Sequence, residues 1–261
     1  MATNMGSVTM WEGYMHNQGM RRLKRDFTDW GVRQFTEADV AYKAAIIELT
    51  ERNPDAIVVD CGCGDGNNTL LLTKRICARE LWGIEADKDV ARQAETKGIR
   101  VWLANLNGHF PLASNTVDVV VANQVIEHLQ DTDLFMAEIW RILKPGGYAI
   151  ICTENLASWH NLFSLLLGWQ PFSLSNVSGK VAGLGNPLAL HHAEEPGVVW
   201  MQHLRVFAYN GLIHLSILHG FAVEAVRGAG YYPLPSKLAA RMAIFDPRHA
   251  PFLALKLRKP L

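Results

Sequence analysis

A short apolar strand that runs directly into a glycine-rich loop constrains the fold of this chain more than any other feature. Residues 57–60 read Ile-Val-Val-Asp, glycine follows at positions 62, 64 and 66, and a helical pattern begins at Thr69. Glycines let a backbone take positive φ and approach a ligand closely, and the start of a helix favours an anionic group. This order predicts an open α/β sheet with a ligand site at the carboxyl ends of its strands.

The remaining chain repeats this alternation. Apolar runs predict strands at 56–60, 81–84, 99–103, 117–122 and 148–152, and amphipathic segments predict helices at 69–78, 89–97 and 131–143. A helix at 206–219 and an antiparallel pair of strands at 221–226 and 252–257 are expected to complete the sheet. The fold class is therefore α/β, with a doubly wound, seven-stranded, mostly parallel sheet.

The 261 residues fit one domain with an insertion. The first helix is expected at 36–52, with Thr36 as its N-cap. Residues 1–35 are interpreted as an N-terminal arm, and residues 36–261 as the domain. Regular patterning fails from about 155 to 205, where Gly, Pro, Ser, Asn and His are frequent, so this segment is interpreted as an insertion after the fifth strand.

Composition excludes several classes of protein. The 25 basic and 25 acidic residues give a formal net charge of zero, which argues against a dedicated nucleic-acid binder. The four cysteines form no CxxC pair, so we expect no cysteine-based zinc site and a reducing compartment. Neither a secretory signal nor an apolar run long enough for a membrane span is found, and the protein is expected to be cytoplasmic.

Two cofactor classes compete for the glycine loop. A dinucleotide site needs GxGxxG, but position 67 is Asn67, and the loop instead reads GxGxG with Asp60 two positions before its first glycine. Glu85 ends the second predicted strand, where a carboxylate accepts hydrogen bonds from ribose hydroxyls. Glu85 supports a ribose but does not choose between the two classes.

Three further segments of the sequence favour one of these two cofactor classes. They are Asn105-Leu106-Asn107 after the third predicted strand, the run from Asp118 to Leu129, and Arg141-Ile-Leu-Lys-Pro-Gly-Gly147. Together with the glycine loop they resemble, in order and spacing, the class I S-adenosylmethionine-dependent methyltransferase superfamily, especially its small-molecule branch. The resemblance covers roughly residues 56–155 and implies a Rossmann-like fold, S-adenosylmethionine as cofactor and S-adenosylhomocysteine as product.

The resemblance also implies roles for nine residues. Asp60, Gly62 and Gly64, with Asp65 in the same loop, would line the methionine part of the cofactor. Glu85 would hold the ribose and Ala86 would border the adenine. Asn105, where many relatives have Asp, would accept from the adenine amine beside Leu106. The backbone of Asn123 would face the sulfonium.

A catalytic residue is harder to predict, because methyl transfer from a sulfonium mainly requires alignment and exclusion of water. Histidine is the natural base near neutral pH, and the candidates are His128, His160 and His203. Some quinone-precursor O-methyltransferases of this branch bind magnesium through Glu-x-x-Glu-His, but here the first carboxylate is replaced by Gln124. Because a hard ion prefers charged oxygen ligands, we expect no metal.

The arm and the insertion are expected to form a lid over the acceptor. They contain the aromatic residues Trp11, Tyr14, Trp30, Trp159, Trp169 and Trp200, which would suit a partly apolar acceptor. The apolar segment 156–172 could line a pocket, form a homodimer face or meet a membrane that carries a lipid-linked acceptor.

The predicted activity is methyl transfer to the O, N or C atom of a small molecule, with an aromatic, sugar or lipid-linked acceptor left open. A catalytically silent partner protein that binds the same cofactor is the alternative. Nucleic acid is not expected as acceptor, because Asn123 is not followed by the Pro-Pro-aromatic run of adenine-N6 enzymes and no Pro-Cys pair occurs.

Overall fold

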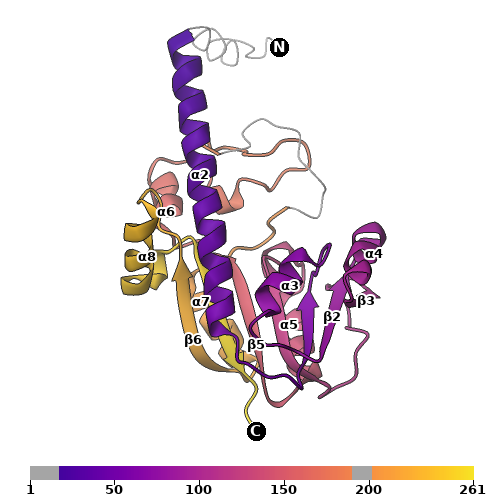
Figure 1. Cartoon of the computed structure of the whole chain (residues 1–261). Helices are drawn as coiled ribbons and strands as arrows, with labels where there is room; N and C mark the ends of the chain where they lie inside the picture. Colours follow the sequence, from indigo (N-terminus) through magenta and orange to yellow (C-terminus); the bar gives the residue numbers. More distant parts are fainter. Residues whose placement is uncertain (1–17, 190–201) are drawn as a thin grey trace, which may run out of the picture.

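The computed structural model of the chain describes residues 18–189 and 202–261. At its centre lies a seven-stranded sheet with the strand order β3-β2-β1-β4-β5-β7-β6, in which β7 alone runs antiparallel to its neighbours (Figure 1). The strands are β1 (Ile57–Cys61), β2 (Glu80–Glu85), β3 (Arg100–Leu103), β4 (Val117–Asn123), β5 (Leu143–Glu154), β6 (Ala222–Ala229) and β7 (Phe252–Arg258). The predicted fold class, including the antiparallel pair β6 and β7, is confirmed.

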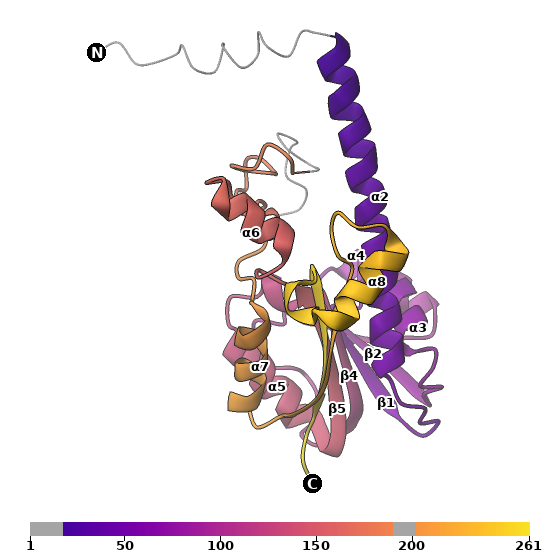
Figure 2. The same ribbon diagram turned by 90° about the vertical axis from the view of Figure 1, so that its left-hand side faces the viewer.

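Helices cover both faces of the sheet, which makes it doubly wound (Figure 2). One face carries α2 (Gln18–Leu49), α3 (Asn67–Thr73) and α4 (Lys88–Thr96), and the other carries α5 (Thr132–Ile142) and α7 (Tyr209–Leu218). Side chains alternate between the two cores, as period-two strands require. In β1, for example, Val58 packs toward α2 and α3, whereas Val59 packs toward α5.

The first helix is much longer than the sequence pattern predicts. α2 begins at Gln18 rather than at residue 36. Thr36 does not cap it, because its Oγ1 donates to the Val32 carbonyl at 2.9 Å inside an existing helical turn. The predicted start was therefore wrong, and the boundary drawn at residue 35 falls within one continuous helix. Residues 1–17 lie outside the described part of the chain.

Two further helices were not predicted. The insertion contains α6 (Trp159–Leu166), followed by the 3-10 turn η2 (Phe172–Leu174), and α8 (Ser236–Phe245) lies between β6 and β7. Prolines at 233 and 235 and glycines at 228 and 230 obscured α8 in the sequence. In the structure Pro235 is the N-cap residue and α8 buries Ala239 and Ala243 against Tyr231.

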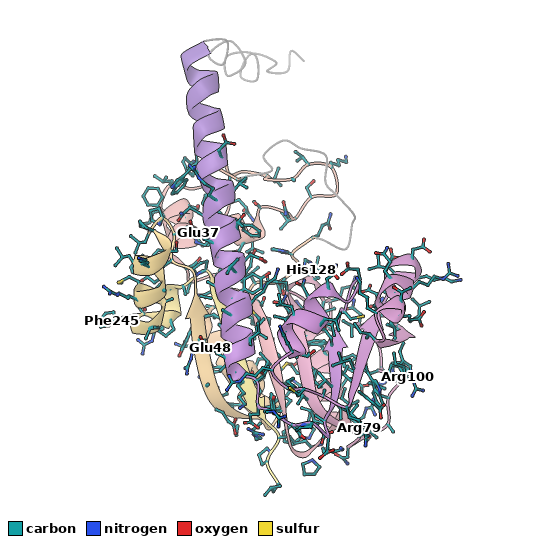
Figure 3. The ribbon with its side chains drawn as sticks, viewed as in Figure 1. Glu37, Glu48, Arg79, Arg100, His128 and Phe245 are labelled. Atoms are coloured by element: carbon teal, nitrogen blue, oxygen red, sulfur yellow. The ribbon has the colours of Figure 1, made fainter. Side chains whose placement is uncertain are left out.

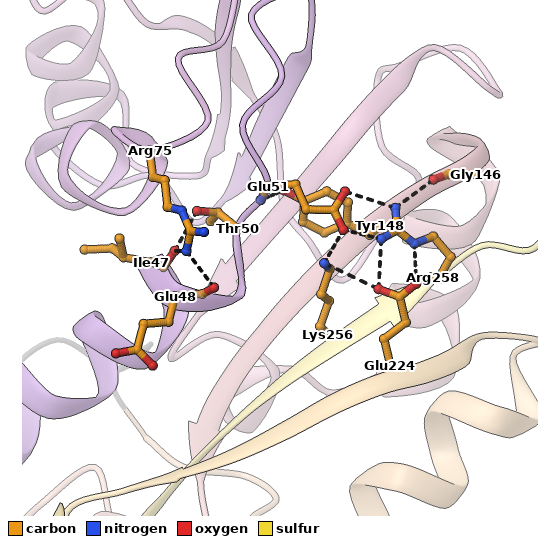
Figure 4. A network of polar contacts seen from close by, with 10 residues as sticks. All are labelled: Ile47, Glu48, Thr50, Glu51, Arg75, Gly146, Tyr148, Glu224, Lys256 and Arg258. Atoms are coloured by element: carbon orange, nitrogen blue, oxygen red, sulfur yellow. Dashed lines mark hydrogen bonds and ion pairs between the residues drawn. The ribbon is translucent and has the colours of Figure 1, made fainter.

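A polar network joins the amino-terminal half of β5 to β6, to β7 and to Glu51, the second residue after α2 (Figure 4). Arg258 donates to both Glu224 oxygens, at 2.7 and 2.8 Å, and to Glu51 at 2.5 Å. Lys256 also contacts Glu51, and the Tyr148 hydroxyl accepts from the Glu51 N–H at 2.8 Å. These contacts fix one edge of the sheet and leave the carboxyl edge free for a site.

Among the described residues, no helix combines the length and apolar character needed to cross a bilayer. The apolar side chains of α6 nevertheless face outward: Leu166 is 84% exposed, and Phe163, Leu165 and Leu167 are also exposed. Of the three interpretations of segment 156–172, these side chains do not support the lining of a pocket. A homodimer face or a membrane contact stays a prediction.

Candidate active site

A cleft of about 660 Å³ opens at the carboxyl edge of the sheet. The loops that follow β1, β2, β3 and β4 form its walls, as expected at the switch point of an open α/β sheet. Figure 3 shows His128 at this edge, beneath the insertion, whereas Arg79 and Arg100 lie at the opposite edge. Of the nine predicted cofactor residues, the cleft is lined by Gly62, Glu85, Ala86, Asn105 and Leu106.

The three glycines of the loop differ in what surrounds them. Gly62 and Gly66 have φ of +74° and +84°, and a Cβ on them would lie 2.9 Å from Val125 and 2.6 Å from Ile99, respectively. Gly64 has φ of +53°, but its Cβ would meet no atom within 4 Å. Packing and backbone shape therefore require Gly62 and Gly66, whereas at Gly64 only the positive φ favours glycine, because no atom of the described residues would contact its Cβ.

The Glu85 carboxylate organises the cleft. Its Oε2 accepts from the Gly64 N–H at 2.9 Å, and its Oε1 accepts from the Ala86 and Asp87 N–H groups at 2.8 and 3.0 Å. A carboxylate has about four acceptor positions, so one remains for a ribose hydroxyl. The second hydroxyl of the ribose would have to displace one of these backbone donors. Glu85 thus has fewer free acceptor positions than the sequence alone suggested.

The loop after β3 provides the next wall. Leu106 is buried and joins the core toward α5, so it presents a fixed apolar surface to the cleft. Asn105 is exposed, and its Oδ1 accepts from the Asn107 N–H at 2.9 Å and from Asn107 Nδ2 at 3.2 Å. An adenine amine that bonds this oxygen would compete with the Asn107 side chain. The role predicted for Asn105 thus requires a local rearrangement.

Two predicted residues lie behind the loop rather than in the cleft. Asp60 is buried and accepts from the Thr69 hydroxyl at 2.5 Å, and burial raises the pKa of its carboxyl to about 7. Asp65 accepts from the Asn67 N–H at 3.0 Å and pairs with Lys97 at 3.1 Å. Both carboxylates hold the loop and the start of α3 in place, and direct contact with a cofactor stays a prediction for each.

A second group of polar side chains follows β4, β5 and β6. Each member has a buried oxygen without a hydrogen-bond partner among the described residues. We call it the polar cluster; its members are Asn123, Glu127, Glu154, Ser158 and Tyr232. Buried polar atoms are almost always paired in native proteins. Five such atoms lie beyond the same edge of the sheet, and they are the candidate contacts for a polar ligand.

The structure brings two of the three candidate histidines together. The rings of His128 and His203 lie 4.9 Å apart, and His128 also lines the cleft. Burial lowers the pKa of His128. His160 instead packs between Phe172 and Tyr232, and burial lowers its pKa to about 3. His128 and His203 therefore remain the better-placed candidates, whereas His160 is a neutral packing residue.

Some residues of the site were missed in the sequence. Gln124 and Val125 line the cleft, and Gln124 has φ of +56°, a strained value for a side chain other than glycine. Its N–H donates to the Cys152 carbonyl at 2.8 Å, which holds the turn after β4. No residue type signals such strain, so the sequence offered only its position after the fourth strand.

The aromatic lid predicted from the sequence is supported only in part. Trp159 is half exposed, stacks on His249 and donates to the Tyr231 hydroxyl at 2.8 Å, so its partners lie within the fold. Trp11, Tyr14 and Trp200 lie outside the described residues. The polar cluster itself contains one aromatic residue, Tyr232, whose ring contacts that of His160 at 5.0 Å.

The fold and the cleft define the class of protein: a Rossmann-like α/β domain with an adenosine-type site at the carboxyl edge. Comparisons with known proteins narrow that class. Residues 59–151 match a family described as a methyltransferase domain. A "Probable S-adenosylmethionine-dependent methyltransferase" of Mycolicibacterium smegmatis is 34% identical over 122 residues, which is 46% of this chain and 45% of that protein. The chain thus spans less than half of that relative.

Two further matches extend over most of the chain. A trans-aconitate 2-methyltransferase of Methylobacterium radiotolerans is 23% identical over 85% of this chain and 84% of its own. The crystal structure of a Mesorhizobium loti S-adenosylmethionine-dependent methyltransferase superposes with a TM-score of 0.55 at 16% identity, over 82% of this chain and 96% of that chain, and shows the common fold. Residues 59–151 thus match a methyltransferase family, and most of the chain shares the fold of solved S-adenosylmethionine-dependent methyltransferases.

The site fits that cofactor. A cleft of about 660 Å³ is within the usual range for a ligand of this size, roughly 300–1,000 Å³. The Glu85 carboxylate lines the cleft and accepts from the Gly64 N–H; the ribose contact predicted for Glu85 stays a prediction. Leu106 and Ala86 supply apolar surface for a purine.

Proposed function

We propose that the protein transfers the methyl group of S-adenosylmethionine to a polar small molecule bound against the polar cluster. The observation that carries this proposal is the set of unpartnered buried oxygens on Asn123, Glu127, Glu154, Ser158 and Tyr232. Their loops follow β4, β5 and β6, next to the cleft assigned to the cofactor. An acceptor that donates and accepts hydrogen bonds would complete their bonding and be aligned with the methyl donor.

The cleft and the polar cluster would have different roles in the reaction. The cofactor supplies an electrophilic methyl group on a sulfonium. Glu85 and the glycine loop hold its nucleoside, and the polar cluster orients the acceptor, which supplies much of the rate through alignment. His128 lies where the two meet, since it lines the cleft and contacts His203. We keep His128 and His203 as acceptor-side residues.

A small-molecule acceptor is also supported by the relative that aligns over most of the chain, which is named for a small tricarboxylate. The zero net charge of the sequence is consistent with an acceptor other than nucleic acid. An aromatic, sugar or lipid-linked acceptor remains within the proposal, and exposed apolar residues of α6 are available to contact a lipid or a second copy of the chain.

Titration calorimetry followed by an acceptor screen tests the proposal. The full chain should bind S-adenosylhomocysteine and not NAD. A methyl-transfer screen over polar carboxylic acids, phenols, sugars and amines should then identify a substrate whose turnover falls in Asn123→Ala with cofactor affinity unchanged. Binding of the cofactor with no turnover on any class would favour the silent partner protein, and binding of NAD alone would overturn the assignment of the cleft.

A further inference from the structure

Glu127, His128 and His203 form a compact group that sequence analysis could not assemble. One donor atom from each lies within 4.8 Å of the other two. Glu127 and His128 belong to the 3-10 turn η1 (Ile126–His128) after β4, whereas His203 lies on the segment that returns from the insertion. The N–H groups of Leu204 and Arg205 donate to the Glu127 carbonyl at 2.8 and 3.2 Å, which brings the two segments together.

Among the described residues, no lysine or arginine forms an ion pair with the Glu127 carboxylate. The residue is fully buried, its Oε2 accepts from the Thr153 hydroxyl at 2.8 Å, and its Oε1 has no partner within the described part of the chain. The nearby Glu154 Oε2 lies 3.5 Å from His203 Nδ1 and has no hydrogen-bond partner among the described residues. Buried carboxylates without hydrogen bonds or cations are costly, so a cation is the expected complement.

Both imidazoles are held as metal ligands usually are. His128 Nδ1 lies 3.0 Å from the Gln202 carbonyl, and His203 Nδ1 lies 2.7 Å from the Ser173 carbonyl. Because a carbonyl only accepts, each Nδ1 carries the proton, and Nε2 keeps its lone pair in the neutral ring. An outer hydrogen bond to a backbone carbonyl is the typical support of a histidine that binds metal.

The spacing leaves room for an ion. Three atoms no more than 4.8 Å apart share a point within about 2.8 Å of each. Typical Zn–N and Zn–O bonds are about 2.0–2.2 Å, so side-chain movements below about 1 Å would close the site.

We propose that Glu127, His128 and His203 bind a divalent transition-metal ion of the Zn²⁺ class. Two imidazole nitrogens and one carboxylate oxygen suit such ions, whereas Mg²⁺ prefers oxygen ligands and water. We expected no metal from the sequence because Gln124 replaces a carboxylate. Gln124 is not a ligand of the site proposed here. The ion would lie where the cleft meets the polar cluster and would offer an open position to an acceptor oxygen; only this last role rests on the proposed function.

Metal binding by the untagged full chain tests the proposal without cofactor or acceptor. After dialysis against a chelator, the protein should take up one Zn²⁺ per chain by titration calorimetry and by elemental analysis. Co²⁺ in its place should give visible d–d bands. In His203→Asn and in Glu127→Gln, Zn²⁺ affinity should fall at least about 100-fold and the Co²⁺ bands should disappear.

A matched control is His219→Asn, which removes an imidazole paired with a single carboxylate, that of Asp133, at 2.9 Å. This variant should bind Zn²⁺ as the parent does. Circular dichroism on each variant shows whether it folds, and His128→Asn replaces any that does not. Absence of uptake by the parent, uptake unchanged in folded His203→Asn, or equal affinity for Mg²⁺ would overturn the metal site. None of these results bears on binding of S-adenosylhomocysteine, so the two proposals fail separately.

Discussion

The carboxylates on the two sides of the carboxyl edge find hydrogen-bond partners in opposite ways. On the cofactor side, Glu85 accepts three backbone N–H groups. Outside the cleft, on α5, Glu138 is satisfied in the same way, by Arg141 and by the Phe110 N–H. On the acceptor side, Glu127 and Glu154 each keep an oxygen without a partner within the described residues. The cofactor half is therefore preorganised by the protein alone, whereas the acceptor half requires a ligand or an ion to complete it.

The largest expected effect is on the free energy of unfolding, and it concerns Glu138, a carboxylate whose oxygens have hydrogen-bond partners. Arg141 holds the pKa of Glu138 down from 4.5 to about 2. A lowered folded-state pKa stabilises the protein above the unfolded pKa, and this contribution is lost as the pH falls from about 4.5 toward 2. Glu138→Gln should lower the free energy of unfolding by about 3 kcal/mol at pH 7, and the difference from the parent should shrink across that range.

Urea unfolding at pH 7, 4 and 3 measures this difference. Glu95→Gln, on the exposed side of α4, is the control and should change stability little. A loss for Glu138→Gln that stays constant down to pH 3 would mean that its ion pair is not the source of the stability.

The next effect concerns cofactor affinity. Glu85→Ala removes a charged acceptor, so affinity for S-adenosylhomocysteine should fall by about 10- to 150-fold, equivalent to about 1.5–3 kcal/mol. Glu80→Ala changes a glutamate at the other end of the same strand, whose carboxylate accepts from Trp82 Nε1 at 2.9 Å. It should leave affinity unchanged. Equal affinities for both variants by calorimetry would remove Glu85 from the ribose site.

A pair of glycines separates strain from ligand contact. Gly64 and Gly98 both have positive φ, +53° and +84°, and a Cβ on either would meet no atom within 4 Å. Each change to alanine should cost about 1–2 kcal/mol of stability. Only Gly64→Ala should also weaken S-adenosylhomocysteine binding, by roughly tenfold, because the Gly64 N–H donates to the Glu85 carboxylate that lines the cleft. Matched losses of affinity would show that the loop's shape alone matters.

The smallest effect is expected in the acceptor half. Tyr232→Phe removes a buried hydroxyl that has no partner in the described structure. Stability should stay the same or rise by up to about 1 kcal/mol, because an unsatisfied polar group is lost. Acceptor turnover should fall while cofactor affinity is unchanged. Thermal unfolding and kinetics measure both; a clear loss of stability would show that the hydroxyl is already satisfied.

The sequence predicted the sheet because its strands depend on local patterns, and five of the nine predicted cofactor residues line the cleft, although their contact with a cofactor stays a prediction. Strand periodicity, the glycine spacing and Glu85 lie within short stretches of chain. The long α2 was missed because residues 18–35 show weak periodicity, although they form one helix with the segment after Thr36. His128 and His203 were candidates in the sequence, but their grouping with Glu127 was not predicted, because it depends on backbone hydrogen bonds between the segments around residues 127 and 204. Contacts between distant segments cannot be predicted from the spacing of residues along the sequence.

A crystal structure of the full chain with S-adenosylhomocysteine tests whether the carboxyl edge is divided in this way. We expect a ribose hydroxyl within hydrogen-bond distance of the Glu85 carboxylate, about 2.5–3.0 Å, the adenine against Leu106, and the thioether sulfur directed toward Asn123 and the polar cluster. A ligand whose ribose lies away from Glu85, or whose sulfur points away from the polar cluster, would contradict the division of the carboxyl edge into a cofactor half and an acceptor half.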